Sequence, residues 1–248
     1  MSASTPARAT AATSAQADWT PGPAEPVLAD AAVHVWRVDL LRVGDGVVEL
    51  LSAAERTRAT TIAGERQRLL WSRSRGALRQ LLGRYLRQNA GTVELSVSAH
   101  GKPRLAAAGE LHFNLSHSRH LALYAFATAG PVGVDVQLAR DRPAARATDY
   151  VALARRSFGE QAARTLAALD EQESREREFL RLWTRYEAEL KRRGTGIGAA
   201  DRPADDDLQA GARHAAPAST VELDVAPDAA AALALGWRAS ELRRWDWA

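Results

Sequence analysis

The amino-acid sequence predicts an α+β fold built in two halves. Short stretches in which apolar residues alternate with period two occur near residue 33, between residues 93 and 137, and after residue 221, as is typical of strands. Two longer stretches, residues 65–88 and 175–193, are helical in character, and the first carries apolar residues at helical spacing. Each half thus offers helices and a few antiparallel strands, and the halves meet near residue 139. This pattern indicates an α+β protein and allows an internal duplication, although no sequence repeat is visible.

Composition narrows the function classes. The chain has 248 residues, no cysteine, and 33 basic against 30 acidic side chains. The absence of cysteine excludes a disulfide scaffold, a thiolate nucleophile and a zinc ribbon. A formal net charge of +3 is a weak sign of nucleic-acid binding. The basic residues are 31 arginines and only two lysines, Lys102 and Lys191, which draws attention to where those two lysines lie.

The N-terminal half follows a low-complexity segment. Residues 1–27 are rich in Ala, Ser, Thr and Pro and predict a disordered tail. They contain no secretory signal, and no apolar run in the chain approaches the ~18 residues of a transmembrane helix. The half itself, residues 28–139, begins with a strand at 33–40. Ser52 and Glu55 form a capping-box pattern that predicts the start of a helix, and a second helix is expected over 65–88.

The pattern of apolar residues also predicts the remaining strands and helices. Short strands are predicted at 93–97, 111–114, 122–128 and 132–137. The C-terminal half, residues 140–248, is expected to hold helices at 144–169 and 175–193, with Gly194 as a C-terminal cap. Residues 194–218 are rich in Gly, Ala, Asp and Pro and predict a long loop. Strands are expected again at 221–225, at 229–235 and in the tail that ends with Trp247.

A polar face on one strand is the first candidate for chemistry. In residues 132–137, period two places three valines on one face and Gly133, Asp135 and Gln137 on the other. A carboxylate inside an apolar strand is costly without a partner. Asp135 either bonds the turn that follows the strand or serves as a ligand for a hard cation, with the Gln137 amide oxygen beside it.

The second candidate lies on the helix expected over 175–193. Trp183, Glu187 and Lys191 are spaced by four residues and therefore share one helix face. Glu187 precedes Lys191 in the order that favours a helical ion pair, which is commonly a solvated surface feature. The neighbouring aromatic residues indicate instead that this face is partly buried.

The other lysine precedes a Ser-His-Ser sequence. Lys102 lies in a Gly-Lys-Pro turn ahead of residues 113–118, which read Phe-Asn-Leu-Ser-His-Ser. A serine hydrolase is disfavoured, because no G-x-S-x-G elbow is present and the adjacent Ser116 and His117 do not readily form a nucleophile–base pair. With Lys102, Ser116 and Arg66 in the same pattern, His117 fits better as an anion-binding donor.

Four motifs in this order resemble a known family. They are Gly101-Lys102-Pro103, Phe113–Ser118, Gly133-Val134-Asp135, and Trp183–Lys191 followed by Gly194 and Gly196. Together they resemble the 4'-phosphopantetheinyl transferases of the surfactin-synthetase-activating type, over roughly residues 30–248. The resemblance implies a pseudo-dimer of two similar α+β halves with coenzyme A held in the cleft between them. It also implies transfer of the phosphopantetheine arm to a serine of an apo acyl or peptidyl carrier protein, with release of 3',5'-ADP.

The resemblance also assigns roles to residues. Asp135 and Glu187 are expected to hold Mg²⁺, with Gln137 as a further ligand, and Glu187 is the candidate base for the carrier serine. Lys191 is expected to neutralise charge on the transferring phosphate. Coenzyme A is expected to bind through a set of residues from the N-terminal half, namely Arg66, Lys102, Pro103, Ser116 and His117.

Two departures from the family pattern keep an alternative function open. Many relatives carry Glu where this chain has Gln137, and Lys where it has Tyr186. The alternative is a non-catalytic module of the same fold that binds coenzyme A or a carrier protein. The protein is expected to be a cytoplasmic monomer with neither a nucleic-acid nor a membrane partner.

Overall fold

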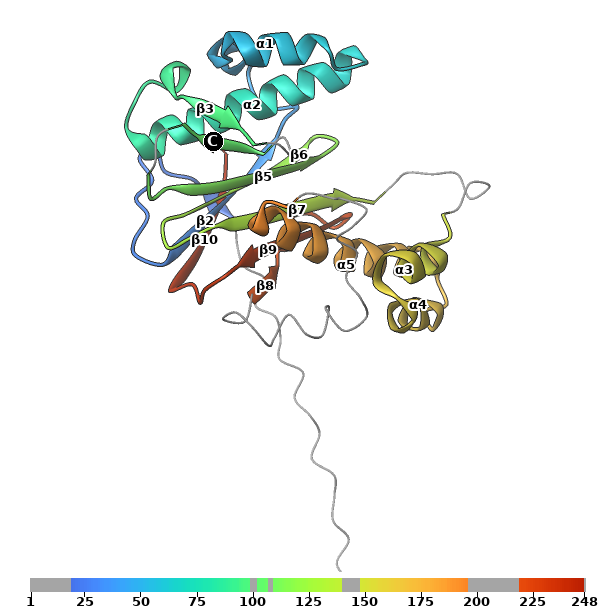
Figure 1. The fold of residues 1–248 in the computed structure, drawn as a ribbon. Helices are drawn as coiled ribbons and strands as arrows, with labels where there is room; N and C mark the ends of the chain where they lie inside the picture. The colour runs from blue at the N-terminus through green and yellow to red at the C-terminus, as the bar shows by residue number, and fades with distance from the viewer. Residues whose placement is uncertain (1–18, 99–101, 107–108, 140–147, 196–218, 248) are drawn as a thin grey trace, which may run out of the picture.

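The structure is a computed structural model that describes residues 19–98, 102–106, 109–139, 148–195 and 219–247. Its core consists of two sheets that pack face to face, with one long helix on the outer face of each (Figure 1). This is the α+β architecture that the sequence predicts. In the strand at residues 132–138 the valines face the other sheet, so the residues between them face the long helix that covers this strand's own sheet.

The first sheet has the strand order β1-β10-β2-β6-β5. Its strands are β1 (Thr20–Pro21), β2 (Ala32–Asp39), β5 (His112–Ser118), β6 (Leu121–Ala127) and β10 (Glu241–Asp246). Strands β2, β6 and β5 are antiparallel, whereas β10 runs parallel to both β1 and β2. The sequence predicts only antiparallel sheets and places residues 140–248 in a separate half, so β10 departs from both expectations. The ring of Trp245 on β10 packs 4.9 Å from that of Trp36 on β2, which gives this strand an apolar place in the sheet.

The second sheet has the order β7-β9-β8 and is antiparallel throughout. Its strands are β7 (Val132–Leu138), β9 (Ala229–Leu235) and β8 (Ser219–Glu222). Val132, Val134 and Val136 are fully buried against the first sheet, where they meet residues such as Val35 and Leu123. The intervening residues of β7 consequently face away from this apolar layer.

Helix α2 (Glu65–Leu86) covers the outer face of the first sheet. Leu78, Leu81 and Leu82 are fully buried against Trp36 and Phe126. The smaller elements of this region are η1 (Asp45–Leu50), α1 (Ala53–Thr60), η2 (Ala90–Thr92) and the β3–β4 hairpin (Leu95–Val97 and Pro103–Leu105).

The predicted capping box at the start of α1 is confirmed. The Glu55 amide donates to Ser52 Oγ at 3.3 Å, and the Ser52 amide donates to the Glu55 carboxylate at 2.9 Å. The Glu55 carboxylate also accepts from Arg79 Nε of α2 at 2.5 Å, so the same side chain ties α1 to α2.

Helix α5 (Gln172–Arg193) covers the outer face of the second sheet and approaches β7 closely. At Gly133 a Cβ atom would lie 1.9 Å from the Ala188 carbonyl oxygen and 2.5 Å from the Arg192 amide nitrogen. Only glycine leaves room for the helix backbone at this distance. The helix ends as predicted at Gly194, whose φ of 76° is in the left-handed region.

Strands β5 and β7 lie side by side at the junction of the two sheets, joined by side chains of β5. Asn114 Oδ1 accepts from the Val134 amide at 2.8 Å, and Ser118 Oγ accepts from the Leu138 amide at 3.1 Å. Between them, the Ser116 hydroxyl reaches β7 as well, through Asp135. We call these three β5 residues, Asn114, Ser116 and Ser118, the seam.

The expected disordered tail is too long at its C-terminal end. Residues 1–18 lie outside the described part of the chain, but residues 19–27 are described, and Thr20–Pro21 form an edge strand of the first sheet. The Trp19 indole donates to the Asp224 carbonyl, and the Arg37 guanidinium lies 4.6 Å from the Trp19 ring centroid. Trp19 therefore packs against the fold, although it lies in a segment whose average composition predicts disorder.

Several predicted boundaries differ from the structure. The helix expected over 144–169 is two helices, α3 (Tyr150–Phe158) and α4 (Glu160–Ala167), broken at Gly159 with φ 86°. Strand β5 continues to Ser118, so the Ser-His-Ser sequence lies within a strand rather than after one. Only the first residues of the loop expected at 194–218 are described.

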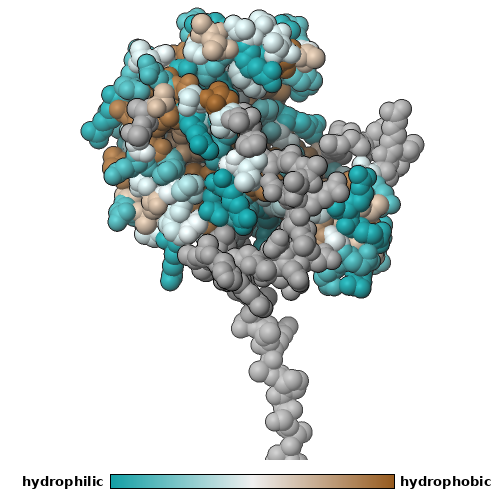
Figure 2. All heavy atoms as spheres, in the orientation of Figure 1, coloured by the Kyte–Doolittle hydropathy of each residue, from teal (hydrophilic) through white to brown (hydrophobic). Residues whose placement is uncertain are grey.

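The surface is polar over most of the visible face. In Figure 2 hydrophobic residues gather on the upper half, which holds α2 and the first sheet. The large apolar side chains with substantial exposed surface are Val27, Leu41, Leu69 and Val97. Within the described part of the chain, no helix combines the length and the apolar character that crossing a bilayer requires.

Candidate active site

Asp135 is fully buried on the face of β7 that meets α5, and its carboxylate is surrounded by donors. The Ser116 hydroxyl donates to Oδ1 at 2.6 Å, and the Lys191 ammonium donates to the same oxygen at 2.5 Å. Gln137 Nε2 lies 3.4 Å from Oδ2. The alternative in which Asp135 bonds the following turn is therefore not the arrangement seen here.

Lys191 and Glu187 reach this carboxylate from α5. The Lys191 ammonium lies 3.8 Å from the Glu187 carboxylate, one helical turn earlier, and also donates to Ser116 Oγ at 2.9 Å. The Glu187 side chain is only 12% exposed, so the pair is not a solvated surface feature. The close approach of α5 at Gly133 is what brings this helix face onto Asp135.

Burial and charge act together on Glu187. Burial raises the pKa of the Glu187 carboxyl, and the nearby negative charge of Asp135 raises that pKa further. Lys191 and a hydrogen bond from the Trp183 side chain oppose this rise. A carboxylate with a raised pKa is a better proton acceptor than an ordinary glutamate at neutral pH.

Lys102 approaches the same cluster from the β3–β4 hairpin. Its ammonium donates to the Lys191 carbonyl oxygen at 2.5 Å, which is one of the carbonyls that the end of α5 leaves without a helical partner. Burial lowers the pKa of Lys102 to about 8, and the positive charges of Arg104, Lys191 and Arg192 act in the same direction. Both lysines of the chain thus meet at one place.

His117 adds a further donor beside the cluster. The residue is exposed, yet neighbouring protein atoms partly desolvate its ring and lower its pKa, as do the positive charges of Lys191 and Arg75. Arg75 extends from α2, where its side chain is mostly buried, and it lies 3.6 Å from the Glu55 carboxylate. Lys191 and Arg75 act on His117, and Lys102 acts on His112 at the other end of β5. Positive charge therefore lies along this strand, where a polyanion would find several partners.

Comparison with known proteins assigns the chain to a family. Residues 131–232 match the 4'-phosphopantetheinyl transferase superfamily. The 4'-phosphopantetheinyl transferase HetI of Nostoc is 35% identical over 189 residues, which cover 73% of this chain and 77% of that protein. The chain belongs to the 4'-phosphopantetheinyl transferase superfamily. It is thus a member of a transferase family, and coenzyme A is the substrate of that family.

Two further relatives agree with this membership over shorter spans. A putative 4'-phosphopantetheinyl transferase of Synechocystis is 34% identical over 61% of this chain and 60% of its own length. The 4'-phosphopantetheinyl transferase Sfp of Bacillus subtilis is 27% identical over 48% of this chain and 50% of its own length. The similarity to Sfp is therefore more distant than the similarity to HetI.

The residues of this transferase fit a hard divalent cation. Asp135 and Glu187 are close enough for the charge of one to raise the pKa of the other, a repulsion that a cation between them would relieve. Among the described residues, no group of three or more His, Cys, Asp and Glu side chains is arranged to hold a metal. One or two carboxylates completed by substrate phosphates and water is, however, the usual set for Mg²⁺.

Two of the predicted coenzyme A ligands lie apart from the cluster. Arg66 is exposed in the first turn of α2, and within the described part of the chain no hydrogen bond or ion pair joins it to the other site residues. Pro103, which directly follows Lys102, is buried and pairs with Val97 of the adjacent strand β3. Gly101 and Gly196 lie outside the described residues.

The sequence prediction missed two contributors. Arg75 lies near His117, and the run of arginines along α2 gave no means of choosing it over Arg66. Asn114 fixes the β7 backbone next to Asp135, and period two on β5 could have placed it on the same face as Ser116. Trp183, which the spacing of four places on the same helix face as Glu187, bonds that carboxylate.

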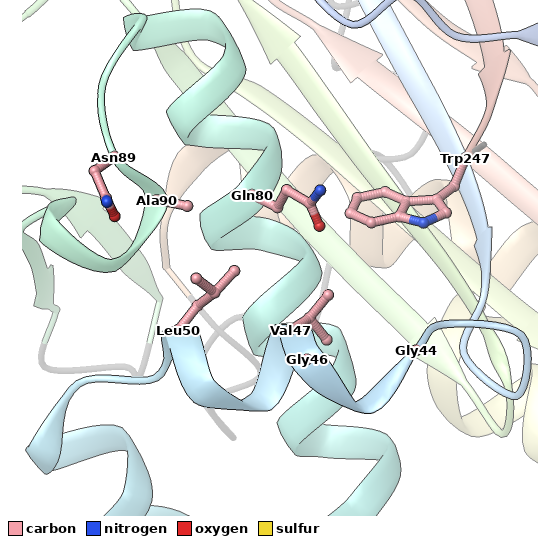
Figure 3. A pocket seen from close by; sticks show the side chains of 8 residues that line it. All are labelled: Gly44, Gly46, Val47, Leu50, Gln80, Asn89, Ala90 and Trp247. Carbon is pink, nitrogen blue, oxygen red and sulfur yellow. The ribbon is translucent and has the colours of Figure 1, made fainter.

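A separate hollow lies between α2, η1 and the segment that ends at Trp247. Its volume is about 570 Å³, and it is lined by Val47 of η1, Gln80 of α2, Asn89, and Trp247 near the C-terminus, among others (Figure 3). None of its lining residues is ionisable. It therefore offers no group for acid–base or metal chemistry, and the cluster around Asp135 remains the candidate site.

Proposed function

We propose that this protein transfers the 4'-phosphopantetheine arm of coenzyme A to a serine hydroxyl of an apo acyl or peptidyl carrier protein, with Mg²⁺. The observation that carries the proposal is the cluster of Asp135, Glu187, Lys191 and Ser116 at the junction of the two sheets. Membership of the transferase family supports it. We also propose that the protein is a monomeric cytoplasmic enzyme of the Sfp type.

The proposed reaction is a phosphoryl-type displacement. The carrier serine oxygen attacks the phosphorus that bears the pantetheine arm, and the bond from that phosphorus to the bridging oxygen breaks. The departing group is 3',5'-ADP. Glu187 accepts the serine proton, directly or through a water, and its raised pKa suits it to this role. Little covalent chemistry is needed beyond alignment and charge neutralisation.

The cationic side chains of the site neutralise the charge on the phosphates. Lys191 lies beside the acidic pair and is proposed to contact the transferring phosphate and the leaving oxygen. Lys102, His117, Ser116 and Arg75 are proposed to bind the remaining phosphates of coenzyme A. Asp135 and Glu187 would hold Mg²⁺, with Gln137 or a water completing the set, and the ion would supply charge neutralisation at the pyrophosphate.

Incubation with coenzyme A, Mg²⁺ and a panel of apo carrier proteins tests the proposal. We expect mass spectrometry to detect the arm on the carrier serine and chromatography to detect an equal amount of 3',5'-ADP. Asp135→Asn and Glu187→Gln should each slow transfer at least about 100-fold, because each removes charge or base from the reacting centre. Glu189→Gln is the matched control, because Glu189 lies on the same helix but pairs with Arg192 and Arg193, and its transfer rate should stay near that of the wild type.

The same experiment separates the non-catalytic alternative. Gln137 is the feature that favours it, because the neutral amide places its Nε2 toward Asp135 in this structure. A folded protein that binds coenzyme A in calorimetry but modifies no carrier and releases no 3',5'-ADP would be such a module. Transfer that persists in both carboxylate variants would show instead that the reacting centre lies elsewhere.

A further inference from the structure

In this structure the Lys191 ammonium joins the two acidic side chains of the site. It lies 2.5 Å from Asp135 Oδ1 and 3.8 Å from Glu187 Oε2. Asp135 has no exposed surface, and Glu187 has little. Charges buried to this degree need a positive partner close by. Lys191 is that partner here, on the side of Asp135 that faces Glu187.

The contacts around Lys191 fix its ammonium in this position. Ser116 Oγ donates to the same Asp135 oxygen and accepts from Lys191 at 2.9 Å, so the three groups form a closed triangle. Lys102 Nζ, from the other half of the chain, holds the Lys191 carbonyl oxygen. An oxygen that accepts two such hydrogen bonds cannot offer the same lone pairs to a metal ion.

We propose that Lys191 is a built-in counter-ion that keeps this site closed to a divalent cation until coenzyme A binds. The inference rests on the proposed function for the identity of the ligands. The phosphates of coenzyme A offer Lys191 an alternative anionic partner, and its four-carbon stem allows the ammonium to move to them. Release of Asp135 then makes its Oδ1 available for coordination. Binding of the cation and binding of coenzyme A are therefore coupled through one side chain, and each strengthens the other to the same extent.

Calorimetric titration of the full-length protein with Mn²⁺, with and without coenzyme A, tests this coupling. In the wild type we expect coenzyme A to tighten Mn²⁺ binding by roughly 10-fold or more. Lys191→Met keeps the apolar stem but removes the ammonium. This variant should bind Mn²⁺ about 10-fold more tightly than the wild type when no coenzyme A is present, and should gain less from its addition.

Lys102→Met is the matched control. It also removes one positive charge near the site, but Lys102 contacts the Lys191 carbonyl oxygen and not Asp135. We expect a smaller gain in Mn²⁺ affinity from this variant than from Lys191→Met. Equal gains would mean that net charge alone sets the affinity and would overturn the inference. It would also be overturned if Lys191→Met bound Mn²⁺ no more tightly than the wild type.

A second measurement needs no substitution in the protein under study, because the chain contains only two lysines. Selective isotope labelling of lysine gives one side-chain NMR signal from Lys102 and one from Lys191, assigned once with Lys102→Arg. Addition of coenzyme A should shift the Lys191 signal, and Mg²⁺ alone should shift it far less. An equal shift with Mg²⁺ alone would contradict a site that is closed to the cation.

The carrier modification assay separates this inference from the proposed function. A wild-type protein that transfers the arm but shows independent binding of Mn²⁺ and coenzyme A would refute the counter-ion and leave the transferase intact. Coupled binding without transfer to any carrier would refute the proposed activity and leave the counter-ion intact.

Discussion

At the residue scale, two buried ionisable side chains show different solutions to burial. Asp135 and His34 are both buried, but they are stabilised in opposite ways. Asp135 accepts hydrogen bonds from a lysine and a hydroxyl. Burial lowers the pKa of His34 and so favours its neutral form. Its Nδ1 lies 2.8 Å from the Tyr85 hydroxyl, which also accepts from Trp36 Nε1.

His34 predicts a loss of stability in mild acid. The pKa of His34 is lowered to about 4, chiefly by burial, while the charge of Glu241 opposes this and that of Arg243 adds to it. Between about pH 6.5 and pH 4 the unfolded chain therefore binds a proton that the folded protein does not, and the free energy of unfolding falls as the pH falls. His34→Asn keeps an acceptor for Tyr85 but cannot titrate. Urea unfolding at pH 7 and pH 5 should show a loss about 1–2 kcal/mol smaller in the variant. Identical losses would show that His34 titrates normally.

Individual residues also mark the limit of sequence prediction. The spacing of Glu187 and Lys191 places them on one helix face from sequence alone, and the alternation in β7 places Asp135 opposite the valines. Which partner each side chain meets depends on how α5 crosses β7, and local periodicity carries no information on that crossing. For the same reason the sequence could not choose between Arg66 and Arg75, which lie on the same long helix.

Element packing depends on single small residues. α5 approaches β7 at Gly133 and meets β9 through three alanines, Ala188, Ala232 and Ala234. Small side chains at all four positions let the helix backbone lie close to the sheet. The distance of α5 from the second sheet is thus set by the residues that lack side-chain bulk.

Gly133→Ala should therefore disturb both stability and activity. The added Cβ would overlap the Ala188 carbonyl oxygen and the Arg192 amide, which are backbone atoms of α5 and can yield only if the helix moves. We expect a loss of about 1–3 kcal/mol in the free energy of unfolding and slower transfer, because Lys191 shifts away from Asp135. Urea denaturation and the carrier assay measure the two effects.

Gly46→Ala is the control for this prediction. A Cβ at Gly46 meets nothing within 4 Å, so this variant should match the wild type in both measurements. If Gly133→Ala were as stable and as active as Gly46→Ala, the close approach of α5 would not be what positions the site.

Helix and strand prediction failed where a single residue outweighs the surrounding pattern. Residues 144–169 have helical character on both sides of Gly159, but the positive φ at that glycine ends one helix and starts another. Strand β5 was expected to end at Asn114, because the polar residues after it resemble a turn. They belong to the strand because they pair with Leu121–Leu123 of β6. Two of them, Ser116 and Ser118, also bond β7, which is outside the local window.

For the whole molecule, the junction of the two sheets decides whether the halves form one site. The seam joins β5 to β7 through side chains, and Asn114 is its most buried member. Asn114→Ala should cost about 1–3 kcal/mol in the free energy of unfolding, because the Val134 amide loses its acceptor in a buried place. It should also slow transfer, because Val134 directly precedes Asp135.

Ser118→Ala provides the comparison, since Ser118 bonds Leu138 at the far end of the seam from Asp135. We expect a smaller loss of stability from this variant and little change in transfer, measured in the same assays. Equal transfer rates in the two variants would mean that the seam holds the halves together without positioning the site.

The position of β10 also bears on how the chain is made. Residues 241–246 lie between β1 and β2, so the first sheet remains incomplete on the ribosome after β6 and β7 have emerged. At about 5–20 residues per second, the ribosome needs on the order of 10 s to travel from β6 to β10. During that interval the apolar edge of β2, which includes Val33 and Val35, is open to pairing with other chains. Yield in expression should therefore respond to chaperones and growth temperature more strongly than the stability of the finished protein would indicate.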